Sequence, residues 1–273
     1  MAEPSRRTEE GHRALVPVLE PRPGGAAERF ADMLGGSHPA AVFAAALVCG
    51  YVALLGVSLL LALLVTDVLV PTAGIGHADE SAIVSLAGDR TPFLSDLSGV
   101  GTAVGGAPVL PILVGLIAIG CAIARKWRLA AFAVFVLTVE SLTYRVTSLL
   151  VPRDRPHVHR MENLPADASY PSGHTAASIA VYAGLVVLLT SAIPNRRLRP
   201  VAWVLAILIP LFVAFSRMYR GMHHPLDVGG GAIVGIGAIL VLLFACRAAE
   251  AAAHSPARSR ESVTRRNRIQ AAS

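Results

Sequence analysis

Charged residues are scarce in this sequence: only 15% of its 273 residues are Asp, Glu, Lys or Arg, whereas 54% are hydrophobic. This balance excludes an ordinary water-soluble domain, because a soluble surface of this size needs a larger share of charge. Apolar runs of about 20 residues, long enough to cross a hydrocarbon core of ~30 Å, occur near 41–66, 107–124, 129–151, 175–193, 200–216 and 228–246. The sequence therefore predicts an all-α fold, a polytopic membrane protein built as a six-transmembrane-helix bundle.

Cysteine is also rare, and its three occurrences, Cys49, Cys121 and Cys246, are odd in number and lack metal-ligand spacing. We interpret them as small core residues. The sequence also lacks an internal repeat and a glycine-rich nucleotide-binding loop. The polar first 38 residues contain no short apolar core with a small-residue cleavage site. We therefore expect no removable signal peptide and a first apolar run that stays as an anchor.

Lysine and arginine are unevenly distributed. Of the 24, 17 lie in residues 1–38, 125–128, 196–199 and 247–268. Because positively charged loops are retained in the cytoplasm, this pattern predicts cytoplasmic termini and places the other loops outside. We expect a cytoplasmic disordered tail over 1–38, a six-helix membrane domain over 39–249 and a basic cytoplasmic tail over 250–273. The loop asymmetry explains the net charge of +6, so no nucleic-acid partner is expected.

The segment Pro171-Ser172-Gly173-His174 stands at the start of the fourth apolar run, where a helix is expected to begin. Ser172 suits the helix cap, Gly173 allows close approach to the backbone, and free N–H groups at a helix start suit a phosphate oxygen. His174 would then lie beside the bound anion. With an ordinary pKa of about 6.5, it can carry a proton to a departing alkoxide. The alternative is a capping turn with an interfacial histidine.

A second cluster follows the fifth apolar run, where Arg217 precedes His223 and Asp227. Asp227, in the first turn of the sixth helix, is placed to bind one ring nitrogen of His223. The other ring nitrogen would then face a substrate, which makes His223 a competent phosphorus nucleophile. Arg217 and Arg155 would offer planar sets of donors to phosphoryl oxygens. The neighbouring His224 is discounted, because adjacent side chains point in different directions.

These residues resemble the signature of the type 2 phosphatidic acid phosphatase superfamily, whose soluble relatives include bacterial acid phosphatases and vanadium haloperoxidases. The signature is a Lys, six residues, then Arg-Pro; next Pro-Ser-Gly-His; and last Ser-Arg, five residues, His, three residues and Asp. The second and third parts are complete here, in residues 171–174 and 216–227. The resemblance extends over about 66–246 and implies a six-helix membrane bundle with its active site on the extracytoplasmic face.

The resemblance also implies residue roles. His223 would be the nucleophile that forms a phosphohistidine, and Asp227 would be its orienting partner. His174 would protonate the leaving group and later activate water. The phosphoryl oxygens would be held by Arg155, Arg217, Ser172 and the amide of Gly173. The family hydrolyses without a metal, so neither a metal nor another cofactor is expected.

The first part of the signature is incomplete, because Ser148 occupies the position of the family's Lys. Arg145, one helical turn earlier, and Arg153, in the following loop, are the candidates to replace it. We prefer Arg145 as an additional phosphate-binding residue. Its alternative role is a structural contact with Glu140, because an arginine in a membrane span needs a partner or a polar cavity.

The implied substrate is a lipid phosphate that enters sideways from the bilayer and leaves its hydrocarbon chain there. The resemblance predicts a metal-independent phosphatase in the cell membrane, acting on undecaprenyl diphosphate, phosphatidylglycerol phosphate or phosphatidic acid. The alternatives are a lipid phosphotransferase with the same intermediate, a non-catalytic phospholipid-binding transporter or sensor, and a metal site built from His174, His223, His224 and Asp227. The neighbouring His157, His159 and Arg160 either select a headgroup or keep their loop hydrated. The sequence makes no prediction of oligomeric state.

Overall fold

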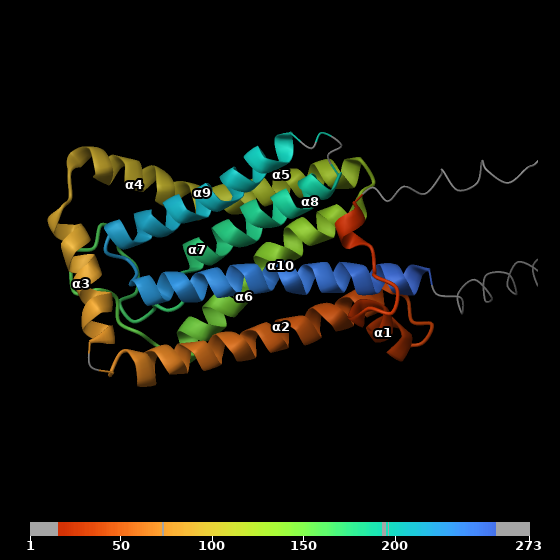
Figure 1. Ribbon diagram of the computed structural model, residues 1–273, viewed down its shortest axis with the longest axis horizontal. Coiled ribbons are helices and arrows are strands. Elements are labelled where there is room, and N and C mark those ends of the chain that lie inside the picture. Colours follow the sequence, from red (N-terminus) through yellow and green to blue (C-terminus); the bar gives the residue numbers. More distant parts are fainter. Residues whose placement is uncertain (1–15, 73, 193–194, 196, 255–273) are drawn as a thin grey trace, which may run out of the picture.

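The computed structural model describes residues 16–72, 74–192, 195 and 197–254, which are almost wholly helical (Figure 1). These residues form no strand, and a single isolated bridge pairs Arg153 with Ala168. In chain order the elements are η2 (Pro17–Leu19), α1 (Ala26–Met33), α2 (Pro39–Leu63), η3 (Leu64–Leu69), α3 (Ile75–Gly88), α4 (Pro92–Val104), α5 (Val109–Ile123), α6 (Trp127–Leu150), α7 (Gly173–Ser178), η4 (Ile179–Ala183), α8 (Gly184–Ala192), α9 (Leu198–Tyr219) and α10 (Pro225–Ala253). The element η2 is a 3-10 helix, and η3 and η4 are π-helical turns.

Six segments are long and apolar enough to cross a membrane: Pro39–Leu69, Pro92–Ile123, Trp127–Leu150, Gly173–Ser191, Leu198–Tyr219 and Pro225–Ala253. Large apolar side chains on these segments, such as those of Leu60, Leu116 and Ile123, are exposed on the outside of the bundle. A water-soluble surface of this kind would aggregate, whereas lipid solvates it. The predicted all-α, six-helix membrane bundle is confirmed, and each predicted apolar run falls on one span.

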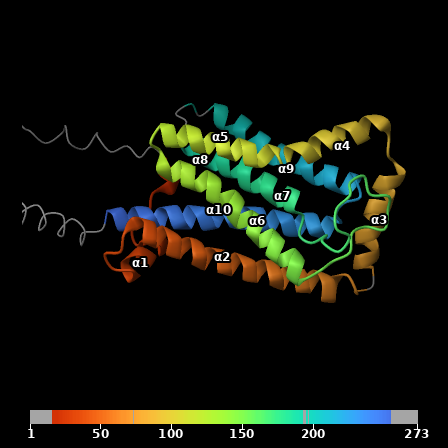
Figure 2. The ribbon, with the colours of Figure 1, turned by 180° about the vertical axis from the view of Figure 1, so that it is seen from behind.

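The second span is longer than the predicted apolar run over 107–124, which left 67–106 as a connection between two runs. Helices α3 and α4 occupy this stretch, and α3 lies across the end of the bundle (Figures 1 and 2). Helix α4 begins at a cap in which the Thr91 hydroxyl accepts from the Leu94 amide at 3.2 Å. Helix α4 packs against α9 and not only against lipid, so it can carry polar residues. These residues interrupt its apolar pattern, and the sequence therefore did not predict it as part of a span. The helix of this span is interrupted at residues 105–108, between the end of α4 and the start of α5.

Residues 16–38, expected to belong to a disordered tail, contain η2 and helix α1 in the structure. Helix α1 packs against α10 through small side chains, which include Ala27 and Ala31 on α1 and Ala245 and Ala248 on α10. Residues 1–15 and 255–273, which include most of the predicted basic tail, lie outside the described residues. Helix α10 itself continues to Ala253, past the predicted domain boundary at 249.

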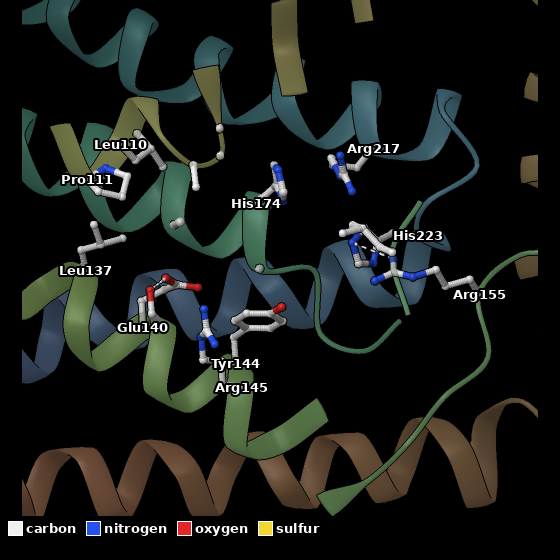
Figure 3. A pocket seen from close by; sticks show the side chains of 17 residues that line it. Leu110, Pro111, Leu137, Glu140, Tyr144, Arg145, Arg155, His174, Arg217 and His223 are labelled. Atoms are coloured by element: carbon white, nitrogen blue, oxygen red, sulfur yellow. Dashed lines mark hydrogen bonds between the residues drawn. The ribbon is translucent and has the colours of Figure 1, made fainter. Parts of the chain in front are cut away.

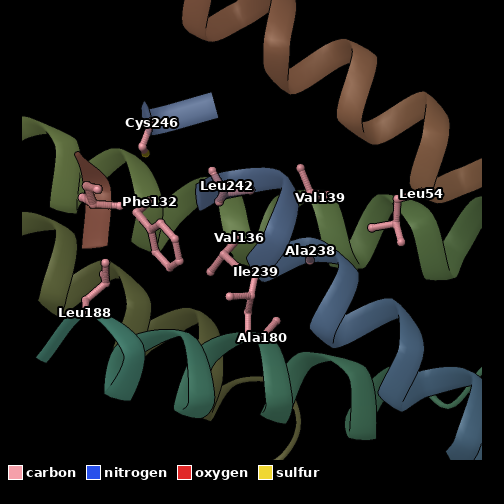
Figure 4. Packing of buried hydrophobic residues seen from close by; sticks show 11 residues of the cluster. Leu54, Phe132, Val136, Val139, Ala180, Leu188, Ala238, Ile239, Leu242 and Cys246 are labelled. Carbon is pink, nitrogen blue, oxygen red and sulfur yellow. The ribbon is translucent and has the colours of Figure 1, made fainter. Parts of the chain in front are cut away.

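Helix α10 is the central element of the core, where its apolar face meets α2, α6 and α8 (Figure 4). Two glycines let the start of the fourth span approach it closely. A Cβ atom on Gly231 would come within 2.5 Å of the Ser172 carbonyl oxygen, and one on Gly235 within 2.5 Å of the Ala176 carbonyl oxygen. This close packing fixes α7 against α10. Of the three cysteines only Cys246 is buried, so the core prediction fails for the other two.

The two described ends of the chain emerge at the same end of the bundle (Figures 1 and 2). The loops 151–172 and 220–224 lie at the opposite end, next to α3. The motif residues found in the sequence are therefore gathered at the end of the bundle away from both termini.

Candidate active site

A cavity of about 280 Å³ opens between the broken second span, α6, α7 and the two motif loops (Figure 3). It is lined by Gly105, Gly106, Ala107, Leu110, Pro111, Leu137, Glu140, Ser141, Tyr144, Arg145, Arg155, Leu164, Gly173, His174, Ala177, Arg217 and His223. The structure therefore brings together six of the eight residues proposed from the sequence. The other two, Ser172 and Asp227, are fully buried behind the cavity wall.

His223 lies in the loop before α10 with only 3% of its surface exposed. Its Nδ1 lies 2.7 Å from the carbonyl oxygen of Ser169, and its Nε2 lies 3.4 Å from Nη1 of Arg155. A carbonyl oxygen only accepts, so Nδ1 carries the proton and the neutral ring has its lone pair on Nε2. Burial lowers the pKa of His223 to about 4, although Asp227 opposes the shift. The ring is therefore neutral at physiological pH, and its Nε2 lone pair lies on the cavity side, where Nη1 of Arg155 donates to it.

Asp227 lies beside Nδ1 of His223, as the sequence suggested, but at an ion-pair distance and not as its nearest partner. The distance from its Oδ2 to Nδ1 of His223 is 3.7 Å. Its oxygens instead accept from the Ser169 hydroxyl at 2.5 Å, from the His224 amide at 2.8 Å and from Arg153. These closer donors occupy both oxygens of the carboxylate. One of them is the backbone amide of His224, the N-cap residue, so Asp227 also caps the start of α10. Asp227 thus fixes Ser169, and Ser169 in turn orients His223.

Arg153, one of the two candidates to replace the missing lysine, is committed elsewhere. Its guanidinium is buried between Asp227 and Asp79, and the nearest oxygen of Asp79 is at 2.5 Å. Asp79 on α3 also accepts from the Leu226 amide at 3.0 Å, which ties α3 to the start of α10. Asp79 was not identified from the sequence, because nothing in the chain marks which residue of a distant helix will meet Arg153.

Arg145, the preferred candidate, lines the cavity from α6. Ser148, at the position of the family's Lys, does not line it and donates to the Arg145 carbonyl oxygen at 3.1 Å. Arg145 makes no ion pair with Glu140 in the described structure, although its charge acts on that carboxyl. Its side chain is exposed at the edge of the cavity.

Arg217 is fully buried, and its guanidinium is only partly used by the protein. Its Nη1 donates to both oxygens of Glu162 at 2.8 Å and to the Thr102 hydroxyl at 3.0 Å. Its Nε and Nη2 have no hydrogen-bond partner among the described residues. A buried cation with unpaired donors is costly, and the free Nε–Nη2 edge of Arg217 has the geometry that suits an oxyanion.

Glu162 was not identified from the sequence. Burial alone would raise the pKa of its carboxyl, but the charges of Arg217 and Arg220 lower it to about 2. The carboxylate therefore stays ionised and holds Nη1 of Arg217 and Nε of Arg220, the latter at 2.7 Å. Its position in an irregular loop gives it no periodic signal that a sequence search could use.

Arg155 joins the two motif loops. Its Nε donates to the Pro165 carbonyl at 2.8 Å, its Nη2 to the Ala168 carbonyl at 2.7 Å, and its Nη1 to the Met222 carbonyl. Burial lowers the pKa of Arg155 to about 10, and the neighbouring charge of Arg217 adds to the effect. Arg155 is still charged at neutral pH, and its Nη1 faces the nucleophilic nitrogen of His223.

The start of α7 carries the Pro-Ser-Gly-His segment. Gly173 and His174 line the cavity. Ser172 stands at the N-cap of α7, but its hydroxyl lies 3.0 Å from the hydroxyl of Thr175 and makes no capping hydrogen bond. The structure therefore does not place Ser172 where it was expected to contact phosphate. The break between α4 and α5 lies against His174, because a Cβ on Gly106 would come within 2.4 Å of its Nε2.

His224 faces away from the cavity. Its Nδ1 is 3.3 Å from Asp227, and its Nε2 is 2.9 Å from Glu80 on α3. Burial lowers its pKa, but these two carboxylates outweigh burial, so the net shift is upward. Three further predicted loop residues, His157, His159 and Arg160, do not line the cavity. In the part of the chain that the structure describes, no three His, Cys, Asp or Glu side chains converge as metal ligands.

Six apolar spans define a multi-pass membrane protein, and its cavity gathers two histidines and the unpaired donors of Arg217. The family model of the PAP2 superfamily matches residues 129–250, which contain all three motif segments. The chain is 26% identical over 181 residues to phosphatidylglycerophosphatase B of Bacillus subtilis, covering 66% of this chain and 89% of that protein. It is 40% identical over 75 residues to undecaprenyl-diphosphatase of Sulfolobus acidocaldarius, covering 28% of this chain and 32% of that protein.

Among solved structures, the crystal structure of the transmembrane PAP2 type phosphatidylglycerolphosphate phosphatase from Bacillus subtilis superposes with a TM-score of 0.61 at 25% identity. The match covers 70% of this chain and 93% of that one. Over residues 129–250 the chain is thus similar to the PAP2 superfamily, and its fold is similar to that of a transmembrane PAP2 type phosphatase.

Proposed function

We propose that the protein is a lipid phosphatase that hydrolyses a phosphate or diphosphate group through a phosphohistidine at His223. The observation that carries this proposal is the orientation of that ring. Its Nδ1 is held by the Ser169 carbonyl at 2.7 Å, and its Nε2 faces Arg155 on a cavity that also holds the unpaired donors of Arg217. A protein that only bound a phosphate would need the arginines but no oriented nucleophile.

In the first step, the Nε2 lone pair of His223 attacks phosphorus and the bond from phosphorus to the leaving oxygen breaks. His174 gives a proton to that oxygen, so the leaving group departs as an alcohol from a phosphomonoester or as a monophosphate from a diphosphate. The Nε and Nη2 groups of Arg217, the charge of Arg155 and the amide of Gly173 stabilise the phosphoryl oxygens in the transition state. The proton of His223 stays on Nδ1, which continues to donate it in a hydrogen bond to the Ser169 carbonyl oxygen.

In the second step, water attacks the phosphohistidine. His174 accepts the proton from this water, the bond from phosphorus to Nε2 breaks, and phosphate leaves while His223 returns to its neutral form. The arginine donors supply the positive charge that this chemistry needs, so the proposal includes no metal and no other cofactor. Asp227 contributes by fixing Ser169, and Arg145 by extending the positive wall of the cavity.

The substrates proposed are lipids of the membrane, because the site opens within a bundle whose surface faces lipid. Phosphatidylglycerol phosphate, undecaprenyl diphosphate and phosphatidic acid all carry a terminal phosphate that fits the arginine end of the cavity. The names of the two relatives, a phosphatidylglycerophosphatase and an undecaprenyl-diphosphatase, support the first two. If an acceptor alcohol replaced water in the second step, the same intermediate would give a phosphotransferase.

We also propose that the site faces the extracytoplasmic side and that both termini are cytoplasmic. In the structure, the site and the described chain ends lie at opposite ends of the bundle, and the basic loop 125–128 lies at the end that holds the termini. Labelling of single engineered cysteines in loop 151–172 and beside α1, with a membrane-impermeant reagent on intact cells, tests this orientation. Labelling of the position beside α1 alone would overturn it.

The activity is tested by phosphate release from these three lipids with purified protein in detergent and a metal chelator. We expect turnover by the native chain and complete loss in His223→Ala. The matched control is His157→Ala, which removes a histidine with an exposed side chain that does not line the cavity. Turnover that depends on added metal would contradict the metal-free mechanism, and lipid binding without turnover would favour a transporter or sensor.

A further inference from the structure

Tyr144 lies on α6 within a membrane-spanning segment and lines the cavity, but it belongs to none of the motifs and has no role in the proposed steps (Figure 3). Its hydroxyl has no hydrogen-bond partner among the described residues. A tyrosine hydroxyl inside a protein normally has such a partner. We therefore expect the partner of this hydroxyl to come from whatever occupies the cavity.

The ring of Tyr144 packs against the start of α7. A Cβ atom on Gly173 would come within 3.2 Å of three carbon atoms of this ring, so the ring lies directly against the glycine. The backbone amide of Gly173 is one of the groups proposed to hold the phosphoryl oxygens. The side chain of Tyr144 therefore lies beside the position proposed for the phosphoryl group.

The hydroxyl of Tyr144 points toward the arginine end of the cavity. Figure 3 shows its oxygen directed away from α6, toward the side that holds His223 and Arg155. Tyr144 lies close enough to Arg155 and Arg217 to interact electrostatically with both guanidinium groups. The hydroxyl thus lies among the donors assigned to the phosphoryl oxygens: the two guanidinium groups and the amide of Gly173.

The place of Tyr144 in the sequence relates it to the incomplete first part of the signature. Ser148, where the signature has its lysine, follows Tyr144 by four residues, and residues four apart lie on the same face of a helix. Helical side chains lean toward the N-terminus of their helix, so a lysine at this position would carry its ammonium group over the turn that holds Tyr144. Arg145 extends from the same turn toward Glu140, whose carboxyl its charge reaches (Figure 3).

We propose that the hydroxyl of Tyr144 is a further phosphate-binding donor, which takes the place of the missing lysine. This inference rests on the proposed phosphatase function and adds a residue that contacts the substrate. The hydroxyl donates a hydrogen bond to a non-bridging phosphoryl oxygen, and its proton stays on the tyrosine throughout the reaction. Arg145 then adds positive charge at the edge of the cavity, while Tyr144 makes the directed contact.

The variant Tyr144→Phe keeps the ring against Gly173 and removes only the oxygen. With a lipid phosphate that the native protein cleaves, we expect kcat/KM to fall at least about tenfold, with an unchanged melting temperature in detergent. The dissociation constant for inorganic phosphate, measured by calorimetry on the purified protein, should rise at least about threefold. Tyr51→Phe is the matched control, because Tyr51 lies on α2, packs against the apolar core and does not line the cavity.

A rescue variant tests the place assigned to the hydroxyl. Adding Ser148→Lys to Tyr144→Phe should restore part of the lost kcat/KM, because the ammonium group would reach over the same turn. Ser148→Lys alone should give a smaller gain, since the hydroxyl of Tyr144 already makes the contact.

Native kcat/KM or native phosphate affinity in Tyr144→Phe would overturn the proposal. A lower melting temperature of this variant would also overturn it and show a structural role. Loss of activity and affinity without rescue by Ser148→Lys would contradict the replacement of the lysine. If the native protein cleaves no lipid phosphate, the proposed function itself fails, whereas the affinity for inorganic phosphate still decides whether Tyr144 binds it.

Discussion

Glu162 holds Nη1 of Arg217 with both carboxylate oxygens at 2.8 Å, on the side of the guanidinium that faces away from the unpaired Nε and Nη2. The Nε and Nη2 nitrogens form the edge of the guanidinium that binds an oxyanion through two parallel hydrogen bonds. Glu162 therefore fixes the direction of this edge without occupying it. The carboxylate of Glu162 thus orients the guanidinium of Arg217, and the Nε and Nη2 donors stay available for a substrate.

Removing Glu162 should impair the reaction while leaving the fold intact. In Glu162→Ala, Arg217 loses the contact that holds its orientation, and we expect kcat/KM to fall about tenfold or more, because preorganised donors account for much of transition-state stabilisation. Glu162→Gln keeps one acceptor oxygen and should lose less. Inhibition by inorganic phosphate provides a second measurement: tighter inhibition and faster turnover in Glu162→Ala would show instead that Glu162 competes with the substrate.

The two arginines considered for the missing lysine should behave differently. Arg153→Ala leaves Asp79 and Asp227 buried without their cation, which should cost about 3–5 kcal/mol of stability and lower the melting temperature in detergent. Arg145→Ala removes an exposed cation at the cavity edge, and it should reduce turnover about tenfold with little change in melting temperature. The reverse pattern, a stable Arg153→Ala and a destabilised Arg145→Ala, would contradict the positions assigned to the two side chains.

Gly106 allows the interrupted second span to approach His174, the proposed proton donor. An alanine Cβ there would come within 2.4 Å of Nε2 of His174, and the ring is easier to move than the helix backbone. Gly106→Ala should therefore keep the fold and reduce kcat by at least about tenfold through misplacement of the proton donor. Gly115→Ala, on the same span with no atom within 4 Å of the added carbon, is the matched control. Similar kinetics for both variants would show that the contact between residue 106 and His174 does not affect turnover.

The ionisation of His223 should differ from that of an ordinary histidine. Burial lowers its pKa to about 4, so the ring should stay neutral down to about pH 4, and NMR of labelled histidine, assigned with His223→Ala, reads this directly. The unfolded chain takes up this proton near pH 6.5, the ordinary value, so the contribution of His223 to stability falls as pH decreases from about 6.5 to 4. A titration of this ring at or above pH 6.5 would show that it is not buried as described.

The long apolar runs could be predicted from the sequence because a helix such as α2 faces lipid or the core along its length. Helix α4 could not be predicted in this way. It packs against α9 and carries Thr102, which contacts Arg217, so its polar residues are part of the site and lower its hydropathy. The position of α4 beside α9 and Arg217 thus explains the polar residues that kept the sequence from predicting this helix.

The motifs identified which residues gather at the site but not how they contact one another. The spacing of His223 and Asp227 suggested a direct hydrogen bond, yet the nearest partner of the ring is the backbone carbonyl of Ser169. A carbonyl group is common to every residue, so no sequence signal marks the one that orients a histidine. The same holds for Glu162 and Asp79, whose roles depend on which arginine the fold brings to them.

The most direct test of the central claim is the detection of phosphate on the ring of residue 223 during turnover. Rapid quenching of purified protein with a radiolabelled lipid phosphate, followed by peptide mapping under alkaline conditions, should recover an acid-labile phosphate on the peptide that contains His223 and none in His223→Ala. Steady release of phosphate with no label on this peptide at any quench time, or with label on another residue, would contradict the account.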